Sequence, residues 1–223
     1  MKTPFLNRKG FTLIELLIVI AILATLGGIS MPVYMTITDN AKKTSARKVC
    51  TDIVEGVTRF GQDNNGMLPY DEKEVEPDKK DQLYLTTTAG KDGRMIEILT
   101  NREEDEDNRI NTTRDTYLKA QEQEAPKDGL FVDASEALHY YDPWGQPYYV
   151  VMCAEDEGCI DPFTAKKRIR NQHCLVYSTG PDSEGVADAH SDSPKKSGKK
   201  ASAPSEEEAE VIEDNVYSWK KAK

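Results

Sequence analysis

The stretch FTLIELLIVIAILATLGGISM, from Phe11 to Met31, decides the fold of this chain. As a helix, its 21 residues span about 31 Å, close to the thickness of one hydrocarbon core. Basic residues precede it at Lys2, Arg8 and Lys9, and the positive-inside rule therefore predicts a cytoplasmic N-terminus. The chain after Met31 is then expected to lie outside the cytoplasm.

This apolar segment differs in two ways from an ordinary secretory signal. It is longer than a typical signal core, lacks an A-x-A exit and opens abruptly after Gly10, so that cleavage at this near end would preserve the helix. It also contains Glu15, and an ionised side chain in hydrocarbon costs on the order of 2–4 kcal/mol unless it has a partner. No Lys or Arg within the segment supplies that partner.

The run KGFTLIELLIVIAILATL, from Lys9 to Leu26, resembles the class III signal of type IV pilins and type II secretion pseudopilins. The resemblance implies that a prepilin peptidase cuts between Gly10 and Phe11 and then N-methylates the new amine of Phe11. Glu15 is expected to pair with that amine in a neighbouring subunit, which would set the axial register of a filament. A proton path is the alternative interpretation of a carboxylate within a membrane.

The helix is expected to continue beyond the membrane, from Phe11 to about Gln62. Gly27, Gly28 and Pro32 weaken it, because each Gly costs about 1 kcal/mol and a Pro about 3 kcal/mol relative to Ala. A kink or local melting is therefore predicted there, and the resemblance implies loss of helicity in the filament; a simple proline kink is the alternative. An amphipathic stripe follows at helical spacing, made of Ala46, Val49, Ile53, Val57 and Phe60.

The sequence thus predicts an α+β fold, in which a long transmembrane and amphipathic helix packs on a small antiparallel β-sheet. The region 66–129 is expected to be a variable, partly helical surface insertion, and its acidic run Glu103–Asp107 a solvated loop, since it lacks the EF-hand pattern. The predicted organisation is a leader at 1–10, a transmembrane and assembly helix at 11–31, its amphipathic continuation at 32–65, the charged insertion at 66–129, and a C-terminal β-domain at 130–223, with a low-complexity, disordered insertion at about 183–211.

Two strands are predicted in the C-terminal region. The run DPWGQPYYVV, from Asp142 to Val151, is typical of a turn that feeds a strand, and Cys174–Tyr177 forms a second strand. DPWGQPY resembles a segment of the protein G family of major type II secretion pseudopilins. The segments 177–182 and 213–219 resemble the two halves of the calcium loop in that family. This resemblance implies calcium ligands at Thr179 (through its carbonyl), Asp182, Asp214 and Asn215, the last where the family usually has aspartate.

Four cysteines, Cys50, Cys153, Cys159 and Cys174, would lie outside the cytosol, where disulfides are expected. Three complete pairings are possible, and Cys153 would face Cys174 if their flanking segments form an antiparallel hairpin. A zinc site is disfavoured because no CxxC pair occurs. The three histidines, His139, His173 and His190, also lack ligand spacing.

Composition limits the function. A net charge of −10 argues against generic nucleic-acid binding, which needs a basic face. Neither His139 nor His173 lies in a catalytic motif, so no enzyme is predicted.

The predicted function is that of a pseudopilin subunit in the periplasmic pseudopilus of a type II secretion system, with a surface type IV pilin for adhesion, motility or DNA uptake as the alternative. Its implied partners are other copies of itself, minor pseudopilins, the prepilin peptidase and the inner-membrane assembly platform. The subunit would cross the inner membrane once, with a periplasmic C-terminal domain, and be extracted on assembly.

Overall fold

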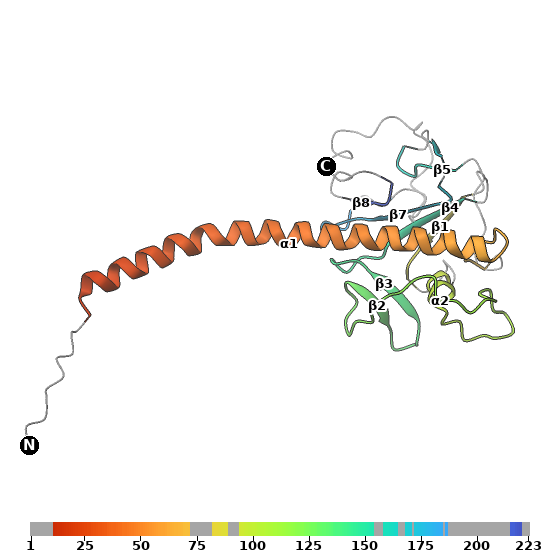
Figure 1. Ribbon diagram of the computed structural model, residues 1–223, viewed down its shortest axis with the longest axis horizontal. Helices are drawn as coiled ribbons and strands as arrows, with labels where there is room; N and C mark the ends of the chain where they lie inside the picture. Colours follow the sequence, from red (N-terminus) through yellow and green to blue (C-terminus); the bar gives the residue numbers. More distant parts are fainter. Residues whose placement is uncertain are drawn as a thin grey trace, which may run out of the picture. The chain divides into compact units, whose positions relative to one another are not determined.

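The computed structural model describes residues 11–71, 82–88, 94–153, 158–164, 168–170, 172–184, 186 and 215–219. The chain divides into two compact units, Met1–Ala41 and Lys42–Lys223, each of which is described by itself. Helix α1, Leu13–Asp63, begins in the first unit and ends in the second (Figure 1). The predicted helix is thereby confirmed to within two residues at either end.

The second unit contains a four-stranded antiparallel sheet with the strand order β1–β4–β7–β8. The two strands predicted from sequence are its central strands, β4 and β7, and Val150 lies opposite Val176 in their register. The described part of the unit also contains two smaller hairpins, β2–β3 and β5–β6, and a short helix, α2. The bounds are β1 Gln82–Thr86, α2 Met95–Thr100, β2 Gly129–Val132, β3 Leu138–Tyr141, β4 Tyr149–Cys153, β5 Cys159–Ile160, β6 Arg168–Ile169, β7 Cys174–Ser178 and β8 Val216–Tyr217.

The part of α1 that lies in the second unit packs on the sheet through the predicted apolar stripe. Four of the five predicted stripe residues are fully buried, Val49 is half-buried, and Cys50 joins the same face. The buried residues of this face are Ala46, Cys50, Ile53, Val57 and Phe60. The helix ends where the sequence predicts. At this end, Gly66 N–H donates to Gly61 O at 2.7 Å in a C-terminal capping arrangement.

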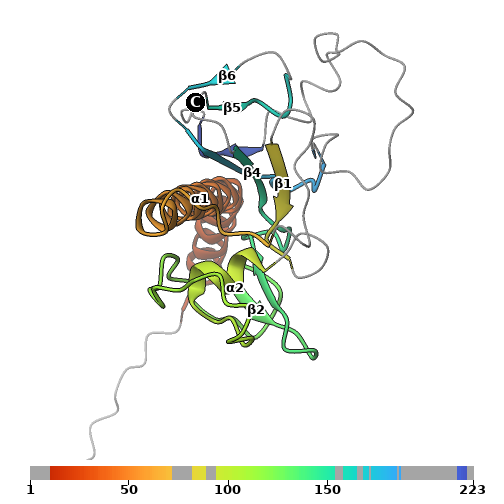
Figure 2. The same cartoon turned by 90° about the vertical axis from the view of Figure 1, so that its right-hand side faces the viewer.

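A second layer covers another side of the same helix segment. Figures 1 and 2 show α2 and the β2–β3 hairpin on a different side of α1 from the four-stranded sheet. Phe60 of α1 meets Tyr117 edge-on, with ring centroids 5.3 Å apart. An added Cβ on Gly56 would lie 3.1 Å from Tyr117 O, so the backbone of this layer contacts α1 directly where the helix has a glycine.

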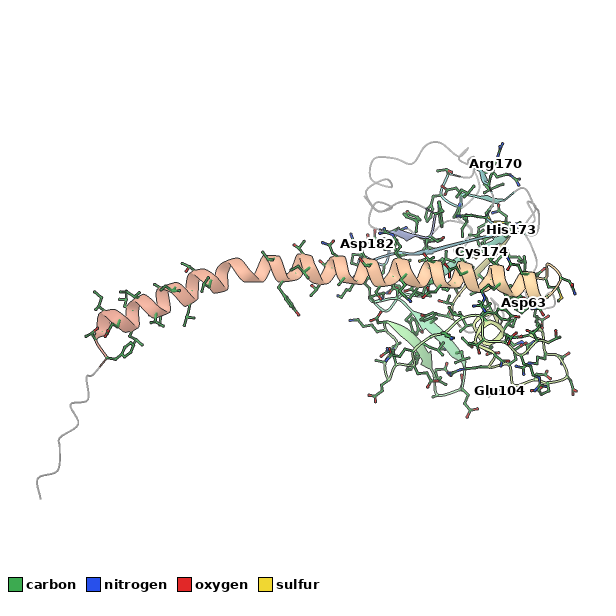
Figure 3. All side chains as sticks on the ribbon, viewed as in Figure 1. Asp63, Glu104, Arg170, His173, Cys174 and Asp182 are labelled. Carbon is green, nitrogen blue, oxygen red and sulfur yellow. A yellow bond between two sulfur atoms is a disulfide. The ribbon has the colours of Figure 1, made fainter. Side chains whose placement is uncertain are left out.

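The region expected to be a charged surface insertion therefore contributes to the core. It supplies the edge strand β1 and buried residues of α2 such as Ile98 and Leu99. Glu103, expected in a solvated loop, is buried, and its carboxylate accepts hydrogen bonds from Ile110 N and Asn111 N at 2.8 and 2.9 Å. These bonds fold the acidic run back on itself, while Glu104 stays exposed on the surface (Figure 3).

Candidate functional site

The N-terminal end of α1 is closed by a local cap. Thr12 N–H and Thr12 Oγ1 both donate to Glu15 Oε2, at 2.8 and 2.6 Å, and Glu15 N–H donates to Thr12 Oγ1 at 3.3 Å. This is the reciprocal capping box that the spacing T-x-x-E favours, and the sequence interpretation of Glu15 missed it. Within one chain the carboxylate is thus oriented towards the helix start, beside Phe11, while Gly10 lies outside the described residues.

The apolar residues of α1 in the first unit are exposed. Phe11, which precedes α1, and Leu13 are 75% and 82% exposed. An 18-residue window of this helix is long and apolar enough to cross a membrane, and none of that window is buried against the described part of the chain. A surface of this kind needs lipid or another helix against it. The large apolar side chains concerned are Phe11, Leu13, Ile14, Leu16, Leu17, Ile18, Val19, Ile20, Ile22, Leu23, Leu26, Val33, Tyr34, Met35 and Ile37.

The predicted weak stretch from Gly27 to Pro32 is helical in the single chain. A Cβ added to Gly27 or Gly28 would meet nothing within 4 Å, so no neighbouring part of the described chain requires a glycine there. Melting at this stretch in a filament stays a prediction.

The DPWG turn is built around one buried carboxylate. Asp142 Oδ1 accepts hydrogen bonds from Trp144 N and Gln146 N, at 2.9 and 2.8 Å. Asp142 Oδ2 accepts a third from Ser178 Oγ at 2.6 Å, and Ser178 Oγ in turn accepts one from Gly180 N at 3.1 Å. Burial raises the pKa of Asp142, although the hydrogen bond from Ser178 lowers it. The turn is thereby tied to the end of β7, where the proposed calcium loop begins.

The two halves of that loop meet at the end of the sheet. Ser178 pairs with Val216, and continuation of this register makes Thr179 and Asn215 the next opposing residues. Both are buried, and Thr179 Oγ1 has no hydrogen-bond partner among the residues that the structure describes. Asp182 is exposed and its Oδ1 accepts Glu184 N at 2.9 Å, whereas Asp214 lies outside the described residues (Figure 3). Among the described residues, no group of three His, Cys, Asp or Glu side chains is placed to hold a metal ion.

The cysteines pair differently from the suggested hairpin partners. Cys153 forms a disulfide with Cys159, and Cys50 and Cys174 are buried free thiols. The reason is the strand register: Cys174 lies opposite Met152, so Cys174 faces α1 while Cys153, one residue further on, faces the other side of the sheet.

His139 and His173, for which the sequence predicts no catalytic role, lie in different surroundings. His139 Nε2 lies 3.0 Å from Asp133 Oδ2, and its ring stacks on Tyr141. The nearby Ser135 donates to Asp133 rather than to the histidine. His173 is exposed beside β7, and its carbonyl accepts Cys153 N (Figure 3).

Comparison with known proteins gives one family match. Residues 6–31 match the family described as the prokaryotic N-terminal methylation motif. No curated protein and no solved structure matches the chain. The match covers the cleavage and methylation region expected from the sequence, together with Glu15 and the first part of α1.

Proposed function

We propose that this chain, a type IV pilin-like protein, is the major pseudopilin of a type II secretion system, a protein G-like subunit that polymerises into a periplasmic pseudopilus. Pilin-like proteins are processed by a prepilin peptidase and form filaments, and they are typically non-enzymatic structural subunits. The secretion branch is supported by the bond between Ser178 and Asp142, because it joins the DPWGQPY turn to the loop segment that carries the second resemblance.

In this proposal, the exposed apolar part of α1 crosses the inner membrane with its N-terminus in the cytoplasm and then packs against other subunits. Glu15 pairs with the Phe11 amine of a neighbouring copy. The two hydrogen bonds that the Glu15 carboxylate accepts within the cap both use Oε2, so a neighbour's amine that binds Oε1 would leave both of them in place. Minor pseudopilins and the inner-membrane assembly platform are the further proposed partners.

We also propose a structural calcium ion at the end of the sheet. Calcium prefers six to eight oxygen ligands at about 2.3–2.6 Å, and the two loop halves, 177–182 and 213–219, offer carboxylate, hydroxyl, amide and carbonyl oxygens. Thr179 and Asn215 are buried and adjoin the last pair of β7 and β8, Ser178 with Val216. A buried hydroxyl such as that of Thr179, without a partner in the described part of the chain, is the kind of polar group that an ion or its water stabilises. Asp182 and Asp214 would add carboxylates, and the ion would further stabilise the folded loop and supply no chemistry.

The test is complementation of a strain that lacks this protein. The wild type is expected to restore the release of folded proteins into the medium, measured by mass spectrometry of culture supernatant and periplasm. Glu15→Leu is expected to abolish release and cross-linkable filaments, because no charge pairs with the Phe11 amine.

The matched variant is Thr12→Val, which weakens the cap but keeps the carboxylate. It is expected to retain most of the release, which separates assembly from capping. Restoration of surface filaments and motility, with secretion unaffected throughout, would instead assign the chain to a surface pilus.

A further inference from the structure

The four-stranded sheet is buried on both faces. In β4 and β7 the side chains facing α1 alternate with Val151, Cys153, Leu175 and Tyr177, which point the other way and are also buried. An antiparallel sheet with two buried faces needs a second cover. Figures 1 and 2 show the β5–β6 hairpin on this outer face, across the sheet from α1.

The C-terminal strand is the weakest part of this sheet. β8 has two residues, and within the described ranges its partner strand is β7, through Tyr177–Tyr217 and Ser178–Val216. It returns to the sheet after the long segment that begins at Thr179, and closing such a loop costs conformational entropy. Two paired residues at a sheet edge do not stabilise this closure by themselves, so other contacts have to contribute.

Aromatic side chains supply several of those contacts, and one of them, Phe163, comes from the hairpin. Phe163, in the β5–β6 hairpin, lies edge-on to Tyr177 at 4.8 Å and to Tyr217 at 5.5 Å. Trp219 packs on Tyr217 at 5.0 Å and on Tyr177 at 6.3 Å. Tyr149 stacks on Tyr177 at 5.1 Å and completes the cluster. Phe163 thus bridges the central strand β7 and the terminal strand β8.

The hairpin is itself fastened to the sheet. The Cys153–Cys159 disulfide joins the end of β4 to the start of β5, and Phe163 N–H donates to the buried Asp161 at 3.0 Å, which fixes the turn. Gly158 has φ +89°, and a Cβ there would lie 2.3 Å from Ile169 O, so only glycine permits this close start of the hairpin.

We propose that the β5–β6 hairpin, fastened by the Cys153–Cys159 disulfide, is a latch that holds β8 at the edge of the sheet and Trp219 against its outer face. Through Phe163, the latch holds β8 beside β7, so that the two ends of the chain segment between these strands stay together without a bound ion. The loop is therefore closed by packing, and a calcium ion would add to a closure that already exists.

The latch also depends on redox state. Its disulfide forms when the two thiols of Cys153 and Cys159 give up two electrons and two protons to a disulfide-bearing oxidant, whose own S–S bond breaks to two thiols. Cys50 and Cys174 do not form alternative disulfides with Cys153 or Cys159 in the folded chain, because both are buried on the α1 side of the sheet. This redox condition rests on the proposed export of the second unit to an oxidising compartment; the latch itself does not.

The experiment is hydrogen exchange, measured by mass spectrometry, on the full chain in detergent micelles. The informative amide is that of Ser218, which donates to Val176 O at 2.9 Å in the closed state. Peptides covering 215–219 are compared with peptides covering β4. The chains are the wild type, Phe163→Ala, the double variant Cys153→Ser/Cys159→Ser and the control Phe131→Ala, whose aromatic contacts are with His139 and Tyr141. Each is measured with calcium and with EGTA.

Phe163→Ala is expected to speed exchange at 215–219 at least tenfold, with β4 unchanged, in both calcium and EGTA. The double serine variant is expected to do the same, and if it unfolds as a whole then Phe163→Ala decides. Unchanged exchange in Phe163→Ala overturns the latch, as does an effect of equal size in Phe131→Ala. Wild-type protection that disappears in EGTA also overturns it, since the ion would then hold β8. None of these readouts needs a filament or secretion, so the latch and the proposed function fail separately.

Discussion

Asp142 is a residue whose turn could be predicted but whose environment could not. The letters D-P-W-G indicate a turn, because proline and glycine have the required backbone preferences. The burial of its carboxylate depends on Ser178, 36 residues away in the chain, and no local pattern encodes that hydrogen bond. The same holds for Glu103, which reads as part of a solvated acidic run and is buried by two backbone donors.

The buried carboxylate predicts a pH dependence of stability. Burial raises the pKa of Asp142 in the folded chain above its unfolded value, so the folded chain binds a proton in the window between the two pKa values. Stability contributed by this group therefore falls as the pH rises through that window. In Asp142→Asn, the free energy of unfolding is expected to lose this slope when urea denaturation is followed from pH 4 to 7.

Asp133 provides a control of opposite sign. Hydrogen bonds from Ser135, then from His139, lower the pKa of Asp133, so its contribution is present above the unfolded pKa and lost on acidification. Asp133→Asn should therefore reduce the decline in the free energy of unfolding towards low pH. A wild type that gains stability over Asp142→Asn as the pH rises would show that the hydrogen bonds outweigh burial at Asp142.

At the scale of elements, regular periodicity made the prediction succeed. The spacing of the apolar residues in α1 predicts which face of the helix is buried, and the β-branched and aromatic residues of β4 predict a buried strand. The sequence from α2 to Leu118 shows no such periodicity. This layer is held by individual contacts, such as the hydrogen bond that Asn111 Nδ2 donates to Ile98 O at 2.9 Å. One feature of the sequence indicates that this layer packs on α1, namely Gly56 within an otherwise amphipathic helix.

Gly56→Ala is expected to lower the free energy of unfolding by about 1 kcal/mol, although alanine favours helix by about that amount over glycine. The new Cβ would lie 3.1 Å from Tyr117 O, and Tyr117 cannot withdraw easily because its N–H and that of Leu118 both donate to Leu99 O at 2.9 Å. Thermal unfolding of the full chain in detergent, followed by circular dichroism, measures this.

Gly61→Ala is the matched control on the same helix. Its added Cβ would meet Met67 O only at 3.5 Å, an ordinary contact, so stability is expected to stay level or to rise by up to about 1 kcal/mol. If Gly56→Ala proves as stable as Gly61→Ala, the layer does not press on α1.

For the whole molecule, the fold class was readable from the sequence, but the arrangement of the cysteines was not. A one-residue difference in register decides which face of the sheet a cysteine occupies, and the sequence does not specify register to that accuracy. The disulfide partner of Cys153 therefore followed from the pairing of β4 with β7, not from spacing.

The proposed calcium ion makes a prediction about the stability of the whole chain. An ion that binds only the folded form raises the free energy of unfolding by about 2.7 kcal/mol at a hundredfold excess over its dissociation constant. Thermal unfolding of the full chain in detergent is expected to shift upward in calcium relative to EGTA. Asp214→Ala is expected to abolish this shift.

Magnesium at equal concentration is the matching control, because it demands a stricter octahedral geometry and is expected to give a smaller shift. A wild type that unfolds at the same temperature in calcium and in EGTA would remove the ion from the proposal. The pilin-like assignment would remain, since it rests on the methylation motif and the fold.

The two thiols enclosed between α1 and the sheet give the chain a built-in reporter. Cys50 and Cys174 are inaccessible, and burial raises the pKa of both thiols, which suppresses the reactive thiolate. An alkylating reagent can therefore react with these thiols only when α1 separates from the sheet. The labelling rate of these thiols counts such openings, in micelles or within an intact filament, without any added probe.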